Sequence, residues 1–233
     1  MLFDALPREP SNPAPGVVHL PNFLALEEQA ALVAQAREIA RSVAGTPVAM
    51  RRPYVGTGQM TTWMLSLGWF WATKPYRLVR EVDGHPTPPI PANYQDIAAR
   101  VMEAAREIDP RVGATPLVET ALVNFYPPGT SMGMHVDAEE EADNAVASLS
   151  IGEETIFRID TPADNDAVPG AYTEVLLMSG DALVFGGPAR RARHGVMGVR
   201  AGTGPDGTGL TEGRINITMR QVHATAGRYA DGL

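Results

Sequence analysis

The sequence predicts a mainly β protein, a jelly-roll-like barrel of two sheets with two helices packed on its outside. Short apolar runs follow one another after about residue 116 and are separated by turn residues. This pattern favours an all-β sandwich or barrel over alternating βαβ units. The expected strands are LVETALVNFY, AVASLSIG, TIFRID, TEVLLM, ALVFGG and RINITMRQV.

The region before the barrel is expected to contain one strand and two helices. GVVHLPNFL reads as a strand that ends near Pro21. Residues 26–43 and 93–108 combine helical spacing of apolar residues with strong helix formers, so each predicts a helix. The segment between them, MTTWMLSLGWFWATKPY, holds all three tryptophans, and its simplest role is to fill the core.

No linker divides the chain, so we expect a single domain over residues 16–223, with the barrel core in residues 116–223. The first fifteen residues carry four prolines and predict a flexible, extended arm. Residues 224–233 are expected to form a tail.

Composition excludes several kinds of site. There are no cysteines, which rules out disulfides, thiolate metal ligands and cysteine nucleophiles, so any metal must be bound by His, Asp or Glu. The net charge of −8 argues against a nucleic-acid partner, since such domains are more often basic. No apolar stretch is long enough to span a membrane and no signal peptide is recognisable, so we expect a cytoplasmic protein.

A metal site is suggested by the stretch NFYPPGTSMGMHVDAEEE. On a strand, His135 and Asp137 point the same way and aim an imidazole and a carboxylate at one position. Among the other histidines His194 is the best third ligand, because it follows an apolar strand and precedes a glycine. Two histidines and one carboxylate suit non-haem Fe(II) with open coordination positions, and zinc hydrolysis is the competing interpretation.

The last expected strand, residues 214–220, carries two arginines on its polar face. Alternation places Arg214, Asn216, Thr218 and Arg220 on one side and three apolar residues on the other. The two arginine Cα atoms are about 20 Å apart on an extended strand, and inward-leaning guanidiniums could bind a small dicarboxylate. The alternative is a pair of surface arginines that form ion pairs with nearby acids.

Together these motifs closely resemble the AlkB family of Fe(II)- and 2-oxoglutarate-dependent dioxygenases, over about residues 55–222. The resemblance implies a double-stranded β-helix barrel, with a preceding flap within about residues 50–80 that covers the substrate. It implies that His135, Asp137 and His194 bind iron. It also implies that 2-oxoglutarate is bound by Arg214 at its distal carboxylate, with Arg220 near the iron-chelating end, and by hydrogen bonds from Asn124, Tyr126 and Asn216.

The activity implied by the resemblance is oxidative dealkylation of N-alkylated bases in DNA or RNA, with Fe(II), 2-oxoglutarate and O₂ as cofactors. The products would be succinate, CO₂ and an aldehyde, and Glu139 matches a position that contacts the damaged base. The base must be single-stranded or flipped out of its duplex. We expect a monomer with no membrane partner.

Two departures from the family pattern concern the substrate. Met60 occupies the position of a tryptophan that stacks on the base, so stacking would pass to Trp63, Trp69 or Trp71. The acidic stretch DTPADND, with Asp164, stands where nucleic-acid-active relatives carry basic residues. Three groups of arginines could bind phosphates instead, or simply be solvated: Arg51 with Arg52, Arg77 with Arg80, and Arg190, Arg191 and Arg193.

Two other functions stay open on the sequence alone. The same iron chemistry could act on a protein or small-molecule substrate, which Met60 and the acidic stretch favour. A catalytically silent binding module on the same fold is the second alternative, although it would not need the three ligands and both arginines.

Overall fold

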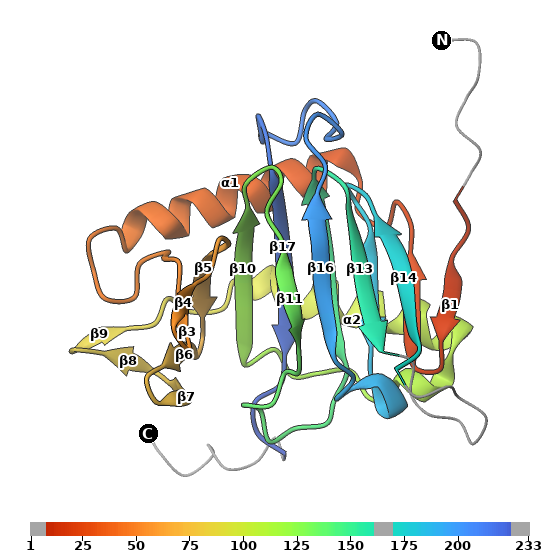
Figure 1. Ribbon diagram of the computed structural model, residues 1–233, viewed down its shortest axis with the longest axis horizontal. Coiled ribbons are helices and arrows are strands. Elements are labelled where there is room, and N and C mark those ends of the chain that lie inside the picture. The colour runs from red at the N-terminus through yellow and green to blue at the C-terminus, as the bar shows by residue number, and fades with distance from the viewer. Residues whose placement is uncertain (1–7, 161–169, 225–233) are drawn as a thin grey trace.

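Two facing sheets form the barrel that the sequence predicts. The computed structural model describes residues 8–160 and 170–224. In Figure 1 the small sheet lies in front, the large sheet lies behind it, and both helices run behind the large sheet. The large sheet has the order β1 (Ser11–Ala14), β2 (Val17–Leu20), β15 (Ala182–Phe185), β12 (Val146–Gly152), β17 (Arg214–Arg220), β10 (Thr120–Tyr126) and β5 (Trp63–Leu67). The small sheet has the order β11 (Met132–His135), β16 (His194–Val199), β13 (Thr155–Asp160) and β14 (Tyr172–Leu177).

Strand β17 of the large sheet has one apolar face and one polar face, as its alternating sequence predicts. In β17, Ile215, Ile217 and Met219 join the core beneath the helices. The opposite face of β17 lines a cavity between the sheets, and Asn216 pairs in register with Asn124 of β10 and with Ser150 of β12. Strand pairing therefore gathers polar side chains from three strands on the inner face of the barrel.

The two helices cover the outer face of the large sheet. α1 (Leu26–Ser42) and α2 (Ala92–Ile108) lie within one residue of their expected bounds, so both predictions are confirmed. Each presents an apolar stripe to the sheet, led by Leu32 in α1 and by Ile97 and Met102 in α2. Each large apolar side chain buried there contributes about 1.5–3 kcal/mol to the stability of the fold.

The small sheet closes the barrel through a second apolar core. Phe157 and Ile159 of β13 pack with Val175 of β14, Val196 of β16 and Phe185 of the large sheet. Strand β16 was not among the expected strands, because HGVMGV contains two glycines. One of them is required by the close approach of β11: a Cβ at Gly195 would lie 2.7 Å from the carbonyl oxygen of Met132.

The N-terminal segment differs from the prediction of an arm. Residues 11–14 form β1, which pairs with β2 at the edge of the large sheet. Proline is tolerated there because an edge strand needs donors on one side only. Asn12 fixes the segment by donating to the carbonyl of Val17 and to Asp109. Residues 1–7, the 225–233 part of the expected tail, and most of the acidic stretch with Asp164 lie outside the described residues.

Residues 54–59 and 70–86 form short hairpins beside the edge strand β5, at the left of Figure 1. Their strands are β3 (Tyr54–Val55), β4 (Gly58–Gln59), β6 (Phe70–Thr73), β7 (Tyr76–Val79), β8 (Glu81–Val82) and β9 (His85–Pro86). Two short 3₁₀ turns, η1 (Pro110–Val112) and η2 (Gly187–Ala189), complete the regular structure. Within the described ranges, no helix is both long and apolar enough to cross a membrane.

Candidate active site

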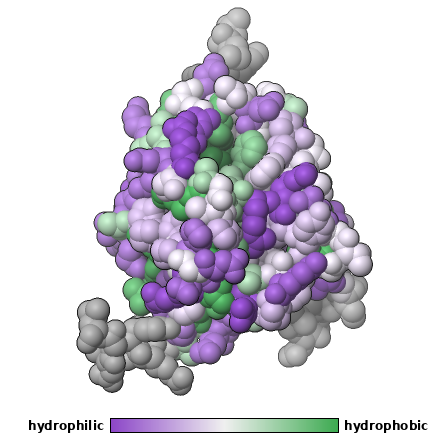
Figure 2. All heavy atoms as spheres, turned by 90° about the vertical axis from the view of Figure 1, so that its left-hand side faces the viewer, coloured by the Kyte–Doolittle hydropathy of each residue, from purple (hydrophilic) through white to green (hydrophobic). Residues whose placement is uncertain are grey.

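A cavity of about 440 Å³ opens between the two sheets and the hairpins. Its inner part is lined by polar side chains of β10, β12 and β17, and its outer part by apolar side chains of the hairpins and of β11. The side of the molecule that carries the hairpins is shown in Figure 2, where apolar residues (green) are interspersed among hydrophilic ones (purple). The cavity therefore joins a polar interior to a largely apolar entrance.

His135, Asp137 and His194 meet at one point on the cavity wall. His135 ends β11 and pairs in register with His194, which begins β16. The Nε2 atoms of His135 and His194 lie 3.8 and 3.9 Å from the two carboxylate oxygens of Asp137. The ligand atoms of all three residues lie within 4.8 Å of one another, so they could bind one metal ion together. The sequence-predicted ligands are thus brought together.

Both imidazoles are oriented for metal binding. Nδ1 of His135 lies 2.9 Å from the carbonyl oxygen of Gly133, and Nδ1 of His194 lies 3.0 Å from that of Ala192. A carbonyl oxygen only accepts, so each Nδ1 must carry the proton and donate it. Each Nε2 then keeps its lone pair and faces Asp137, the arrangement typical of histidine metal ligands.

The surroundings of Asp137 and His194 favour the protonation states in which these two groups bind a metal. Burial by itself would raise the pKa of Asp137, but neighbouring positive charge, above all Arg220, holds that pKa well below its usual range. Burial lowers the pKa of His194, which favours the neutral ring. An ionised carboxylate and a neutral imidazole bind a divalent cation without first losing a proton.

Arg214 is fully buried on the inner face of the barrel, and one of its guanidinium nitrogens has no hydrogen-bond partner among the described residues. Its Nε donates to Ser150 Oγ at 2.9 Å, and its guanidinium carbon lies 5.3 Å from the centre of the Tyr126 ring. Its Nη1 is buried and has no hydrogen-bond partner in the part of the chain that the structure describes. A buried cation with an unused donor is costly unless an anion pairs with it. The carboxylate of a ligand in the cavity would supply that partner.

Arg220, at the other end of the same strand, is already paired. Its Nη1 lies 3.1 Å from Asp137 Oδ2 and 2.7 Å from Glu140 Oε1. The sequence predicts that the two arginines bind a small dicarboxylate between them. In the part of the chain that the structure describes, Arg220 forms ion pairs with two carboxylates and Arg214 forms none, and binding of a dicarboxylate by both arginines stays a prediction.

Asn124, Tyr126 and Asn216 line the cavity between these two arginines. Asn216 Nδ2 donates to Ser148 Oγ at 2.7 Å, and its Oδ1 accepts from Asn124 at 3.4 Å. Asn124 Oδ1 is buried without a partner among the described residues. Burial raises the pKa of Tyr126 to about 12, so its hydroxyl stays protonated and can donate.

The outer wall of the cavity contains some of the expected substrate residues. Met60, Trp71 and Glu139 line it, and Trp71 stacks with Tyr76 at 6.0 Å between ring centres. Other members of this wall carry no signal in the sequence and reach the cavity from the hairpins, from β5 and from β11 with the residue after it: Val55, Met64, Tyr76, Leu78, Met134 and Val136.

Trp63 and Trp69 do not line the cavity. Strand alternation in β5 puts Met64 on the cavity side, so Trp63 falls on the opposite side with Leu65 and lies under Arg52. Trp69 lies between the guanidinium of Arg80 and the ring of His223, at 4.7 and 5.1 Å.

The arginine clusters are partly used by the protein itself. Arg190 is buried and contacts Glu140, and Arg191 donates to three backbone carbonyls. Arg51 donates to the carbonyl of Trp71 and lies over Phe70. Arg190, Arg191 and Arg51 are therefore structural, and the exposed members of the clusters are Arg52, Arg77, Arg80 and Arg193.

Comparison with known proteins gives consistent results. A model of the 2OG-Fe(II) oxygenase superfamily matches residues 16–220. An alpha-ketoglutarate-dependent dioxygenase AlkB homolog of Caulobacter vibrioides is 32% identical over 220 residues, which are 92% of this chain and 91% of that protein. The solved structure of OsALKBH1 superposes with a TM-score of 0.79 and 26% identity, over 91% of this chain and 100% of that chain.

A longer relative is also similar. The DNA N(6)-methyladenine demethylase ALKBH1C of Arabidopsis thaliana is 30% identical over 227 residues, which are 89% of this chain and 48% of that protein. The chain thus spans about half the length of this relative.

Proposed function

Because the chain belongs to the AlkB family within the 2OG-Fe(II) oxygenase superfamily, we propose that it oxidatively dealkylates N-alkylated bases of DNA or RNA. The family uses Fe(II), 2-oxoglutarate and O₂. The observation that carries the proposal is the composition of one cavity. It combines the His135, Asp137 and His194 cluster, the spare donor of buried Arg214, and an apolar wall with Trp71.

In this proposal His135, Asp137 and His194 hold the iron through two imidazole nitrogens and one carboxylate. A bound Fe(II) would supply the activation of O₂, of which one oxygen atom would enter succinate as 2-oxoglutarate loses CO₂ and the other would hydroxylate the alkyl carbon next to the base nitrogen. Arg214 binds the distal carboxylate of the cosubstrate, and Asn124, Tyr126 and Asn216 orient the rest of it. The hydroxylated alkyl group then leaves as an aldehyde and restores the base.

The outer cavity wall would bind the base. Trp71 and Tyr76 provide aromatic surface for stacking, and Glu139 accepts hydrogen bonds or faces the positive charge of an alkylated base. Met60 stands at the position where the family pattern has tryptophan, so stacking shifts to these aromatics. A base can enter only when single-stranded or flipped, and we propose that the protein acts on such substrates as a monomer. A cytoplasmic location stays a prediction.

The test is anaerobic loading with Fe(II) and 2-oxoglutarate, followed by O₂ and a methylated oligonucleotide, with succinate and formaldehyde measured separately. Formaldehyde in proportion to succinate, dependent on the methyl group, is the expected result. Succinate without formaldehyde on every methylated strand, single- or double-stranded, would refute base dealkylation while leaving the oxygenase chemistry intact.

A second candidate function is the same chemistry on a protein or small molecule. Two observations favour it: the net charge of −8, and the use of Arg190 and Arg191 for internal contacts rather than for phosphates. Supporting the first candidate are the AlkB relatives, one of them named as a DNA demethylase. A silent binding module would produce no succinate at all in the same assay.

A further inference from the structure

Asp137 lies where no strand supports it. The pairing of β11 with β16 ends at His135 and His194, and β12 begins only at Val146. Asp137 therefore belongs to an irregular segment, residues 136–145, and has no ladder hydrogen bond to set its backbone. A metal site, however, needs its ligand atoms held within a fraction of an ångström.

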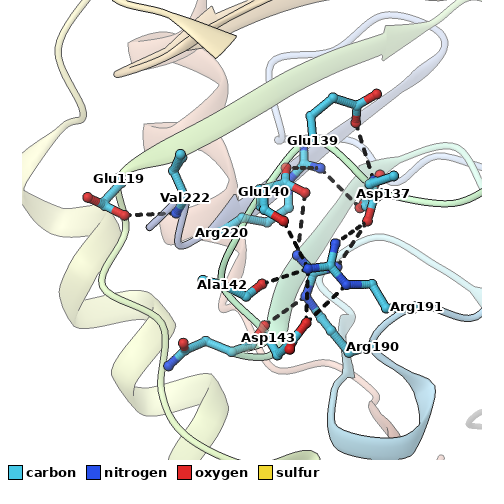
Figure 3. Close-up of polar contacts among 12 residues, drawn as sticks. Glu119, Asp137, Glu139, Glu140, Ala142, Asp143, Arg190, Arg191, Arg220 and Val222 are labelled. Carbon is cyan, nitrogen blue, oxygen red and sulfur yellow. Dashed lines mark hydrogen bonds and ion pairs between the residues drawn. The ribbon is translucent and has the colours of Figure 1, made fainter. Parts of the chain in front are cut away.

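Arg191 holds the backbone of this segment through three carbonyl oxygens. It donates to Asp137 at 2.7 Å, to Glu140 at 2.9 Å and to Ala142 at 3.1 Å. A further bond reaches the Asp143 carboxylate at 2.9 Å. Figure 3 shows the Arg191 guanidinium at the centre of these contacts. The planar fork of arginine makes such multiple donation possible.

Arg190 and Glu140 are buried and hold the same segment through further polar contacts. Arg190 Nε donates to the carbonyl of Asn144 at 2.9 Å, and its Nη2 lies 3.4 Å from Glu140 Oε2. The other oxygen of Glu140 accepts from Arg220, which in turn contacts the Asp137 carboxylate. The side chains of Arg190 and Glu140 are only 2% and 1% exposed. The backbone and the carboxylate of Asp137 are thus held from two sides.

We propose that Arg190 and Arg191, with Glu140, are positioning residues for the metal ligand Asp137. The two arginines lie three and four residues before His194, so one short segment carries a ligand and also the side chains that place another ligand beside it. We call Arg190, Arg191 and Glu140 the clamp. It fixes Asp137 relative to His194 where no strand pairing joins the two ligands. This inference rests on the proposed metal site and is independent of the substrate.

The test uses Co(II) as a metal probe, titrated into the full metal-free chain and followed by its visible absorption. Arg191→Ala is expected to bind Co(II) at least about tenfold more weakly, with a changed spectrum, as is common when a residue that orients a ligand is lost. Arg191→Lys should also weaken Co(II) binding and change the spectrum, because one ammonium group cannot donate to all three carbonyls. This variant provides the test if Arg191→Ala folds poorly.

Two controls separate positioning from general destabilisation. Arg158→Ala removes an arginine of similar exposure, 32% against 36%, that pairs with Glu174 on the outside of the barrel. Asp143→Asn removes the negative charge of the 80% exposed side chain that pairs with Arg191 but leaves the three bonds from Arg191 to backbone carbonyls. Both should bind Co(II) like the unmodified chain, whatever their melting temperatures.

The outcomes are distinct. If Arg191→Ala and Arg191→Lys keep the affinity and spectrum of the unmodified chain while His135→Ala loses Co(II), the clamp does not position the ligand and the metal site stands. If His135→Ala also binds normally, the metal site and the clamp both fail. If Arg158→Ala weakens Co(II) binding as much as Arg191→Ala does, the effect is general destabilisation and the inference is overturned.

Discussion

At the scale of single residues, the two arginines of β17 show how environment separates identical side chains. Arg220 forms ion pairs with Asp137 and Glu140, whereas Arg214 forms none among the described residues. Each keeps one buried guanidinium nitrogen without a hydrogen-bond partner there, Nη1 of Arg214 and Nε of Arg220. Burial lowers the pKa of Arg214, yet guanidinium remains charged at any physiological pH. Arg214 is thus the residue on which binding of an anionic cosubstrate should depend.

The prediction at Arg214 concerns 2-oxoglutarate affinity. Arg214→Lys keeps a positive charge but loses the planar fork, so the KM for 2-oxoglutarate should rise about tenfold or more, matching the loss of a hydrogen bond between charged groups. Co(II) binding without cosubstrate should be unaffected. The control is Arg200→Lys, an arginine 65% exposed and paired with Glu154. Equal KM values for both variants would exclude Arg214 from cosubstrate binding.

At the scale of elements, the placement of β5 and β6 relative to the cavity decides which tryptophan faces it. Trp71 lines the cavity from β6, while Trp63 lies on the far side of β5. Both are tryptophans of the same region, so they form a matched pair for mutation.

For this pair we expect opposite results on the substrate. Trp71→Ala should raise the KM for a methylated oligonucleotide about 10- to 100-fold, because base stacking on an aromatic side chain contributes about 1–3 kcal/mol. Trp63→Ala should leave that KM nearly unchanged, and neither should alter the KM for 2-oxoglutarate. A larger effect at Trp63 than at Trp71 would mean that the substrate binds on the other side of β5.

A glycine in β16 controls the approach of the two strands that carry the histidines. A Cβ at Gly195 would lie 2.7 Å from the Met132 carbonyl oxygen, whereas a Cβ at Gly133 on the partner strand meets nothing within 4 Å. Gly195→Ala should therefore destabilise the protein by about 1–3 kcal/mol in urea unfolding and weaken metal binding. Gly133→Ala should do neither. Similar values for both variants would show that β11 adjusts freely.

At the scale of the whole molecule, Asp181 ties the N-terminal segment to the barrel. This fully buried carboxylate accepts from Arg8 and His19 and from the backbone N–H groups of Asn22 and Met178. Burial alone would raise its pKa, but these hydrogen bonds outweigh burial and lower the pKa to about 2 from an ordinary value of 3.8. The ionised form therefore stabilises the fold.

The direction of the pH effect follows from this shift. A lowered folded-state pKa contributes stability that is complete above pH 3.8 and is lost as the pH falls toward 2. The contribution is about 2 kcal/mol at neutral pH. Asp181→Asn should lower the free energy of unfolding by about that amount and flatten its dependence on pH between 4 and 2. Asp96→Asn, at an exposed site on α2, is the control and should retain the full acid dependence.

The fold class, both helices and the inward face of β17 were predictable because they depend on local periodicity. The alternation of polar and apolar residues in RINITMR gives the strand a polar face and an apolar face wherever it lies in the sheet. The apolar stripe of each helix predicts burial against a core without specifying which residues form that core. The meeting of His135, Asp137 and His194 also followed from residue type and order. Strand β16 was not predicted, because its glycines do not fit a strand pattern. Gly195 permits the close approach of β11, and this contact between distant segments cannot be seen in the local sequence.

The sequence by itself thus determined the architecture, the residues of the His135, Asp137 and His194 cluster and the polar face of strand β17. Only the tertiary structure decided which tryptophans face the cavity and which arginines pair with carbonyls and carboxylates of the protein itself. It also decided that residues 11–14 add a strand to the large sheet. The physical reason is that side-chain direction along a strand is a local property. The neutralisation of a charge and the lining of a cavity depend on segments that are distant in sequence, such as Arg191 and Asp137.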